Sequence, residues 1–154
     1  MPNIFIVVGD ANAGKSALIR CLTGLSRRRD GTWRVATEQN PDMPIFVLIS
    51  ALQESENYAR TPAQFIKDVN EKGFENVLVP LRRSRSRGFP DCYEYINAFH
   101  NADGWEIMQI VVLGEGFEEN RLPAGLLNLL VINLPQENPA NHNAANVRRQ
   151  WGWI

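Results

Sequence analysis

Eight residues near the amino end of the chain, residues 9–16, combine residue types and a spacing that can hold phosphate groups. Gly9 and Gly14 bracket a short loop, and Lys15 and Ser16 follow it directly. Because glycine tolerates conformations that turn successive backbone N–H groups to one side, such a loop can form a concave cradle for anions. The ammonium group of Lys15 would bind the β- and γ-phosphates, and the hydroxyl of Ser16 would bind Mg²⁺. The spacing predicts a site for a nucleotide polyphosphate.

The elements expected on either side place this loop where a phosphate site needs it. Residues 3–8 form a continuous apolar run, which is typical of a strand buried on both faces. Residues 15–25 carry apolar side chains at helical spacing. A helix that begins at the loop directs its first N–H groups and its positive end toward the ligand. The expected nucleotide-binding residues are Gly9, Asp10, Ala11, Asn12, Ala13, Gly14, Lys15, Ser16 and Ala17.

Through this loop and its flanks the chain resembles the P-loop NTPases. The resemblance implies binding of a nucleoside triphosphate with Mg²⁺ on a doubly wound sheet. Residues 10–24 are especially similar to the first motif of GTPases, but no D-x-x-G follows the strand expected at 45–50. No N-K-x-D follows the strand expected at 127–134. The specific match therefore covers about the first 25 residues; ATP is the expected nucleotide, and a GTP-binding protein with degenerate motifs is the alternative.

The acid that holds Mg²⁺ in most P-loop hydrolases, an Asp at the end of an apolar strand, has no direct counterpart here. Three carboxylates are candidates to share the metal with Ser16. Glu115 is the first choice, because its Glu-Gly sequence after an apolar strand is similar to the metal-site strand of molybdopterin-guanine-dinucleotide accessory P-loop proteins. Glu54, after another strand, is the second, and Asp10 lies in the loop itself. The alternative for each is an ordinary solvated carboxylate.

Arginine greatly outnumbers lysine, 13 against 3, and four arginines occur within residues 82–87. This basic loop follows an expected strand, and open α/β sheets bind ligands at the carboxyl ends of their strands. Arginine suits bidentate phosphate contacts and the charge that develops in phosphoryl transfer. The loop resembles the arginine-bearing lid of small nucleotide and metabolite kinases, and Arg83, Arg85 and Arg87 are candidates to clamp the γ-phosphate or an acceptor. The expected catalytic residues are Lys15, Arg85 and Arg87. The alternative is a solvated surface loop.

The pattern along the whole chain predicts a single α/β domain over residues 1–154. We expect a three-layer, doubly wound, mostly parallel sheet of five to six strands, with the P-loop after the first strand. Residues 32–50 are expected to form two adjacent strands, one of which is antiparallel at a sheet edge. Strands are expected at 3–8, 32–37, 45–50, 76–81, 107–113 and 127–134, and helices at 15–25, 62–72, 91–101 and 144–151.

Composition narrows the class of protein. The chain has 154 residues, of which 44% are hydrophobic and 21% charged, with a net charge of −1. These values are ordinary for a globular domain, and no overall positive charge points to nucleic acid or to a membrane surface. No apolar run approaches the length of a membrane span, and the start lacks the basic residues of a signal peptide. Because Cys21 and Cys92 fit reduced, buried thiols, we expect a cytoplasmic protein without a membrane partner.

Three functions are compatible with these residues. The first is Mg²⁺-dependent binding of a nucleoside triphosphate with transfer or hydrolysis of its γ-phosphoryl group, by an NTPase or by a kinase with a small-molecule acceptor. The second is a regulatory module that binds nucleotide with little or no turnover. The third is a P-loop protein that acts on DNA or on a replication partner, against which the near-neutral charge argues. Whether the protein is an enzyme is open at this stage.

Overall fold

The computed structural model describes residues 2–24, 30–54, 59–126, 129 and 131–154. In this part of the chain the strands are β1 (Asn3–Gly9), β2 (Gly31–Val35), β3 (Met43–Val47), β4 (Asn76–Arg82), β5 (Glu106–Leu113) and β6 (Val131–Leu134). The helices are α1 (Lys15–Thr23), α2 (Pro62–Lys72), α3 (Cys92–Asn101) and α4 (Ala140–Trp151), with two 3₁₀ turns, η1 (Glu119–Arg121) and η2 (Ala124–Leu126). No helix in the described ranges is long and apolar enough to cross a membrane.

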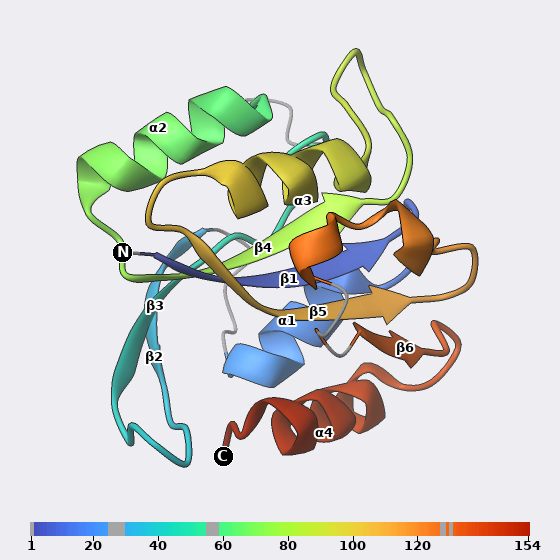
Figure 1. The fold of residues 1–154 in the computed structure, drawn as a ribbon. Helices are drawn as coiled ribbons and strands as arrows, with labels where there is room; N and C mark the ends of the chain where they lie inside the picture. The colour runs from blue at the N-terminus through green and yellow to red at the C-terminus, as the bar shows by residue number, and fades with distance from the viewer. Residues whose placement is uncertain (1, 25–29, 55–58, 127–128, 130) are drawn as a thin grey trace.

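The six strands form one sheet in the order β2-β3-β4-β1-β5-β6 (Figure 1). β1 lies at its centre, parallel to both β4 and β5, and β3 and β6 extend the parallel part on either side. β2 pairs antiparallel with β3 and forms one edge. The predicted α/β class, the mostly parallel sheet and the antiparallel edge strand are therefore confirmed.

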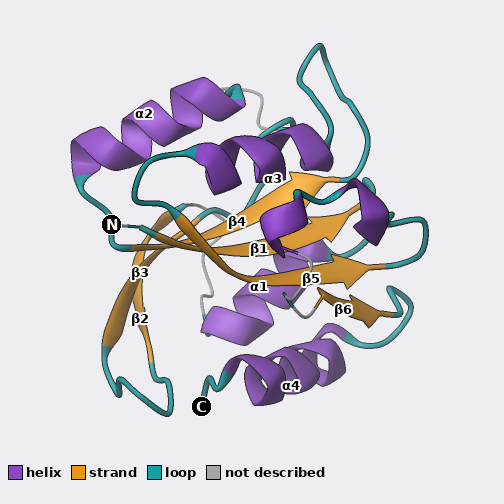
Figure 2. Ribbon diagram, viewed as in Figure 1, coloured by secondary structure: helices purple, strands orange, loops and turns teal. Residues whose placement is uncertain are grey.

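Helices cover both faces of the sheet, α2 and α3 on one and α1 and α4 on the other (Figure 2). Successive side chains of β1 enter opposite layers because side chains alternate along a strand. Ile6 packs with the layer of α2 and α3, whereas Val7 packs with Leu18 of α1 and Val147 of α4. Burial on both faces explains why the sequence of β1 contains an uninterrupted run of apolar residues.

Helix ends follow their local signals where those signals are present. Thr61 and Gln64 form a reciprocal capping box at the start of α2, and Gly73 ends the helix in a left-handed conformation. The helix expected at 62–72 is thus confirmed. α4 begins at Ala140, four residues before the expected start at residue 144, because Pro139 and the polar residues after it look like a loop in sequence.

Two expected strands are shorter than the sequence suggests. β3 ends at Val47 rather than at residue 50, and the following segment stays beside β4 through Leu48 N–H to Leu78 O (3.0 Å) and Leu52 N–H to Pro80 O (3.4 Å). The proline nitrogen of β4 has no hydrogen to donate, so the ladder does not continue. Of the strand expected at 127–134, residues 131–134 form β6 and residue 129 is a bend, and residues 127, 128 and 130 lie outside the described residues.

Candidate functional site

The loop between β1 and α1 is a tight turn at the carboxyl end of the central strand. At Gly9 an added Cβ would lie 3.0 Å from the Cβ of Ala13, so a larger residue would push the loop apart. Gly14 has φ +92°, in the left-handed region that favours glycine. The turn is closed by Ala13 N–H donating to Asp10 O at 3.1 Å, and Leu18 N–H donates to Gly14 O at 2.9 Å as α1 begins.

Lys15 folds back over this loop. Its Nζ donates to the carbonyl oxygens of Gly9 (3.0 Å) and Asp10 (2.8 Å), and the side chain is only 6% exposed. Burial lowers the pKa of Lys15 from its ordinary value, and the nearby carboxylate of Glu54 opposes that shift. A buried cation destabilises a fold unless polar or charged partners surround it. The two carbonyl oxygens and the carboxylate of Glu54 are such partners for the ammonium group.

Glu54 reaches the same point from the segment that follows β3. Its Oε1 lies 3.8 Å from Lys15 Nζ and 3.9 Å from Arg82 Nη1. This oxygen is buried, and it accepts no hydrogen bond from any group in the described part of the chain. Ser16 is tied to the same segment, because its hydroxyl donates to Ile49 O at 2.8 Å. The carboxylate and the hydroxyl therefore converge on the loop from two elements.

Arg83 links three loops at the carboxyl edge of the sheet. Its Nε and Nη2 donate to the two carboxylate oxygens of Asp10, both at 3.1 Å, which raises the pKa of Arg83. Its Nη1 donates to Gly116 O at 3.0 Å, and its backbone N–H donates to Gly9 O at 3.2 Å. A Cβ at Gly116 would lie 2.6 Å from Nη1, so a larger residue there would require the guanidinium group to move.

Gln53 fixes both ends of the basic loop and gave no signal in the sequence. It is fully buried, and its Nε2 donates to the carbonyl oxygens of Arg82 (2.9 Å) and Pro90 (3.1 Å). Its Oε1 accepts from Arg82 N–H at 3.0 Å. A single glutamine after a strand belongs to no recognisable spacing pattern in the sequence. Its contacts in the structure show that it holds the two ends of residues 83–89 together, so that this segment forms a closed loop.

The structure separates the predicted site residues into two groups. Lys15, Ser16, Asp10, Glu54, Arg82 and Arg83 are brought together around the loop. Arg85 is exposed and donates to Glu94 of α3 at 3.4 Å, away from the loop. Arg87 and Glu115 are exposed, and within the described ranges neither makes a hydrogen bond or an ion pair. Of the basic loop, Arg82 and Arg83 are therefore the arginines beside Lys15.

A pocket of about 200 Å³ opens beside the loop, between the starts of α1 and α4. The residues around it are Ala13, Gly14, Ala17, Leu18, Leu113, Gln136, Asn138, Ala140 and Asn143. Asn143 is buried and donates to Pro135 O at 2.9 Å, and its Oδ1 has no partner within the described residues. Small apolar walls with amide groups at one end suit a flat heterocyclic ring.

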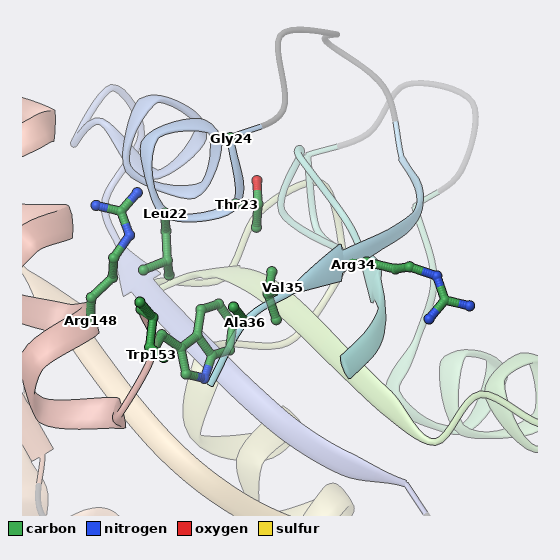
Figure 3. Close-up of a pocket in the computed structure, with 9 residues that line it drawn as sticks. Leu22, Thr23, Gly24, Arg34, Val35, Ala36, Arg148 and Trp153 are labelled. Carbon is green, nitrogen blue, oxygen red and sulfur yellow. The ribbon is translucent and has the colours of Figure 1, made fainter. Parts of the chain in front are cut away.

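A larger hollow of about 450 Å³ lies at the opposite end of α1. Figure 3 shows the ring of Trp153 against Val35 and Leu22, with Arg34 pointing away from the other labelled side chains. Arg148 is directed toward α1, where it donates to Cys21 O. Because the loop of residues 10–14 precedes α1 and this hollow follows it, the two are separate features of the molecule.

No protein-family model matches the chain, and a search of curated proteins finds no match. Within the part of the chain that is described, no three or more His, Cys, Asp or Glu side chains gather where they could share a metal ion.

Proposed function

We propose that the loop of residues 9–17 binds a nucleoside triphosphate, with ATP as the expected nucleotide, and that the protein transfers or hydrolyses its γ-phosphoryl group. The observation that carries the proposal is the buried ammonium group of Lys15, held over its own loop by the carbonyls of Gly9 and Asp10. These hydrogen bonds are local and replaceable, so the charge is available to a polyanion. The loop also begins a helix, whose first N–H groups favour phosphate.

The chain's own groups then have distinct tasks. Backbone N–H groups of the loop and of the first turn of α1 bind the phosphate oxygens. Lys15 turns from its two carbonyl partners to the β- and γ-phosphates, and Arg83 turns from Asp10 toward the γ-phosphate. Both cations stabilise the charge that develops on the transferring group. Arg82, which faces Glu54, adds a third positive charge at the same edge.

Ser16 and Glu54 fit the chemistry of Mg²⁺, which prefers oxygen ligands and keeps several waters. The fit rests on the buried Oε1 of Glu54, which lacks a hydrogen-bond donor in the described residues and faces the loop. When bound, the metal would neutralise charge on the phosphate oxygens. Glu115, the first choice from sequence, stays a prediction; it would have to approach from the exposed loop after β5.

The pocket beside Ala17 is the expected place for the nucleoside base. Gln136, Asn138 and Asn143 present amide groups there, and an amide both donates and accepts hydrogen bonds. The unpartnered Oδ1 of Asn143 is an acceptor that suits an exocyclic amino group, such as that of adenine. Titration with ATP and with GTP under the same conditions tests this preference.

The direct test replaces Lys15 with alanine and measures triphosphate binding by calorimetric titration with Mg²⁺. We expect the wild-type protein to bind and Lys15→Ala to bind at least about 100-fold more weakly, which is the loss of about 2.7 kcal/mol of charge-assisted hydrogen bonding. Lys67→Ala is the matched control, because Lys67 is exposed and only pairs with Glu71 across one helical turn. Wild-type protein that binds no triphosphate at all would overturn the proposal.

A regulatory module that binds nucleotide without turnover is the second candidate. It is favoured by the position of Glu54, which faces two cations and is therefore partly neutralised before any metal arrives. Phosphate release, measured with Mg²⁺ and with a panel of small acceptors, separates the candidates. Turnover that disappears in Lys15→Ala supports phosphoryl transfer, whereas tight binding with no turnover supports the regulatory module.

A further inference from the structure

A further pocket, of about 250 Å³, is lined by Arg83, whose guanidinium group also pairs with Asp10. Its charged and aromatic walls are Arg83, Arg85, Asp91, Tyr93, Glu118 and Arg121. These residues come from the loop after β4, the start of α3 and the segment after β5, which lie at the same edge of the sheet as the phosphate loop (Figure 1). Arg83 therefore contacts both this pocket and the loop of residues 10–14.

The walls of this pocket are held by contacts among themselves. The guanidinium carbon of Arg121 lies 3.9 Å from the ring centroid of Tyr93, and its Nη2 donates to Asp91 Oδ2 at 3.3 Å. The hydroxyl of Tyr93 accepts from Glu118 N–H at 2.8 Å. A guanidinium group stacked on an aromatic ring and paired with a carboxylate loses little further freedom when a ligand arrives.

The pocket offers many more donors than acceptors. A guanidinium group carries five N–H donors, yet Arg85 and Arg121 each donate one hydrogen bond to a side chain. Arg121 Nη1 also lies 3.6 Å from Oε2 of Glu118, an ion pair that leaves further donors on both arginines. Asp91 has little capacity left, because Oδ1 accepts from Glu94 N–H at 3.1 Å and Oδ2 from Arg121. A ligand that fits must therefore supply acceptors, as a carboxylate or a phosphate group does.

We propose that this pocket binds a small organic anion that carries a carboxylate or a phosphate group. Its volume lies below the roughly 300–1,000 Å³ of pockets for drug-sized ligands, so the anion is a compact metabolite. Its position beside Arg83 makes it a second ligand next to the triphosphate, and this part of the inference rests on the proposed function. Binding of the anion to this pocket, by contrast, does not depend on the proposed function.

Calorimetric titrations with succinate and with inorganic phosphate test the pocket and separate the two acceptor chemistries. We expect at least one of them to bind wild-type protein, and Arg121→Gln and Arg85→Gln each to weaken that binding about tenfold. Arg34→Gln is the matched control, since Arg34 also pairs with a carboxylate, Asp42 at 2.9 Å, but lies on β2. Affinity for the triphosphate should not change in Arg121→Gln.

Inorganic phosphate could also enter the phosphate loop, so the same titrations are repeated with Lys15→Ala. Binding in the pocket should survive that change and should still respond to Arg121→Gln. Absence of binding for both anions, or equal affinity in wild type and in both arginine variants, would overturn the inference. The proposed function fails on a different result, namely no triphosphate binding by the wild-type protein, whatever the two anions do.

Discussion

At the scale of single residues, the three cations of the site, Lys15, Arg82 and Arg83, are paired with two carboxylates of the chain itself. Arg83 is held by Asp10 through two parallel hydrogen bonds, and Lys15 and Arg82 share Glu54. A carboxylate in such a fork occupies the donors that a phosphate group would use. These five side chains together carry one net positive charge, and under the proposed function a triphosphate would compete with the protein's own carboxylates.

This competition predicts the effect of Asp10→Asn. The amide keeps the size of the side chain but removes the charge that holds Arg83 and that repels phosphate. We expect affinity for a triphosphate to rise about tenfold, with the increase greatest at low salt. Asp42→Asn is the control, because Asp42 forms an exposed pair with Arg34. Lower affinity in Asp10→Asn, measured by titration at two salt concentrations, would instead show that the Asp10 carboxylate helps to hold the ligand or its metal.

At the scale of elements, the site is formed by the residues that directly follow β1, β3 and β4. The pairing of Gly9 with Arg82 in the parallel ladder brings the basic loop to the loop of residues 10–14. Gln53 then holds the start and the end of the basic loop through its single buried amide. Because Glu54 is the next residue, the segment that clamps the basic loop also supplies the carboxylate that faces Lys15.

Replacement of Gln53 by leucine should release the basic loop. Two carbonyl groups and one N–H group would lose their partner, at a cost of about 2–4 kcal/mol. We expect trypsin to cut within residues 82–87 about tenfold faster than in wild type, because local opening frees the backbone around these arginines to enter the protease. Gln39→Leu, at an exposed position, is the control. Equal cleavage rates in limited proteolysis would show that the basic loop is held by other contacts.

At the scale of the whole molecule, two apolar layers on either side of the sheet determine stability. Cys92 at the start of α3 lies fully within one of them, and burial raises the pKa of its thiol from 9.0 to about 12. Above pH 9 the thiol of the unfolded chain loses its proton while the folded protein keeps it. The free energy of unfolding therefore falls as pH rises from about 9 to 12, by at most about 1.4 kcal/mol per pH unit.

Cys92→Ala isolates this contribution. We expect the variant to be less stable than wild type at pH 7 by about 1 kcal/mol, because a small cavity is left. Between pH 8 and pH 10, however, the free energy of unfolding of the variant should decline less steeply than that of wild type. By pH 10 the accumulated difference between the two declines should be about 1.4 kcal/mol. Denaturant titrations across this range measure both effects. Parallel curves for the two proteins would show that the Cys92 thiol does not couple to unfolding.

The sequence by itself determined the elements and the loop, because the signals for these are local. Helix α2 is specified by Thr61, Gln64 and Gly73 within its own segment, and the buried strands by continuous apolar runs. The spacing of Gly9, Gly14, Lys15 and Ser16 is local in the same sense. Where the local signal is misleading, as in the polar start of α4, the predicted boundary was wrong.

Only the tertiary structure decided which distant side chains meet around Lys15 and the loop before it. Asp10 and Arg83 are 73 positions apart in the chain, and their contact depends on β4 lying between β3 and β1. β4 ends at Arg82 and the chain bends at residues 83 and 84, so Arg83 faces Asp10 while Arg85, two residues later, turns to Glu94 of α3. Strand order and register arise from packing across the sheet, and no local pattern in the sequence encodes them.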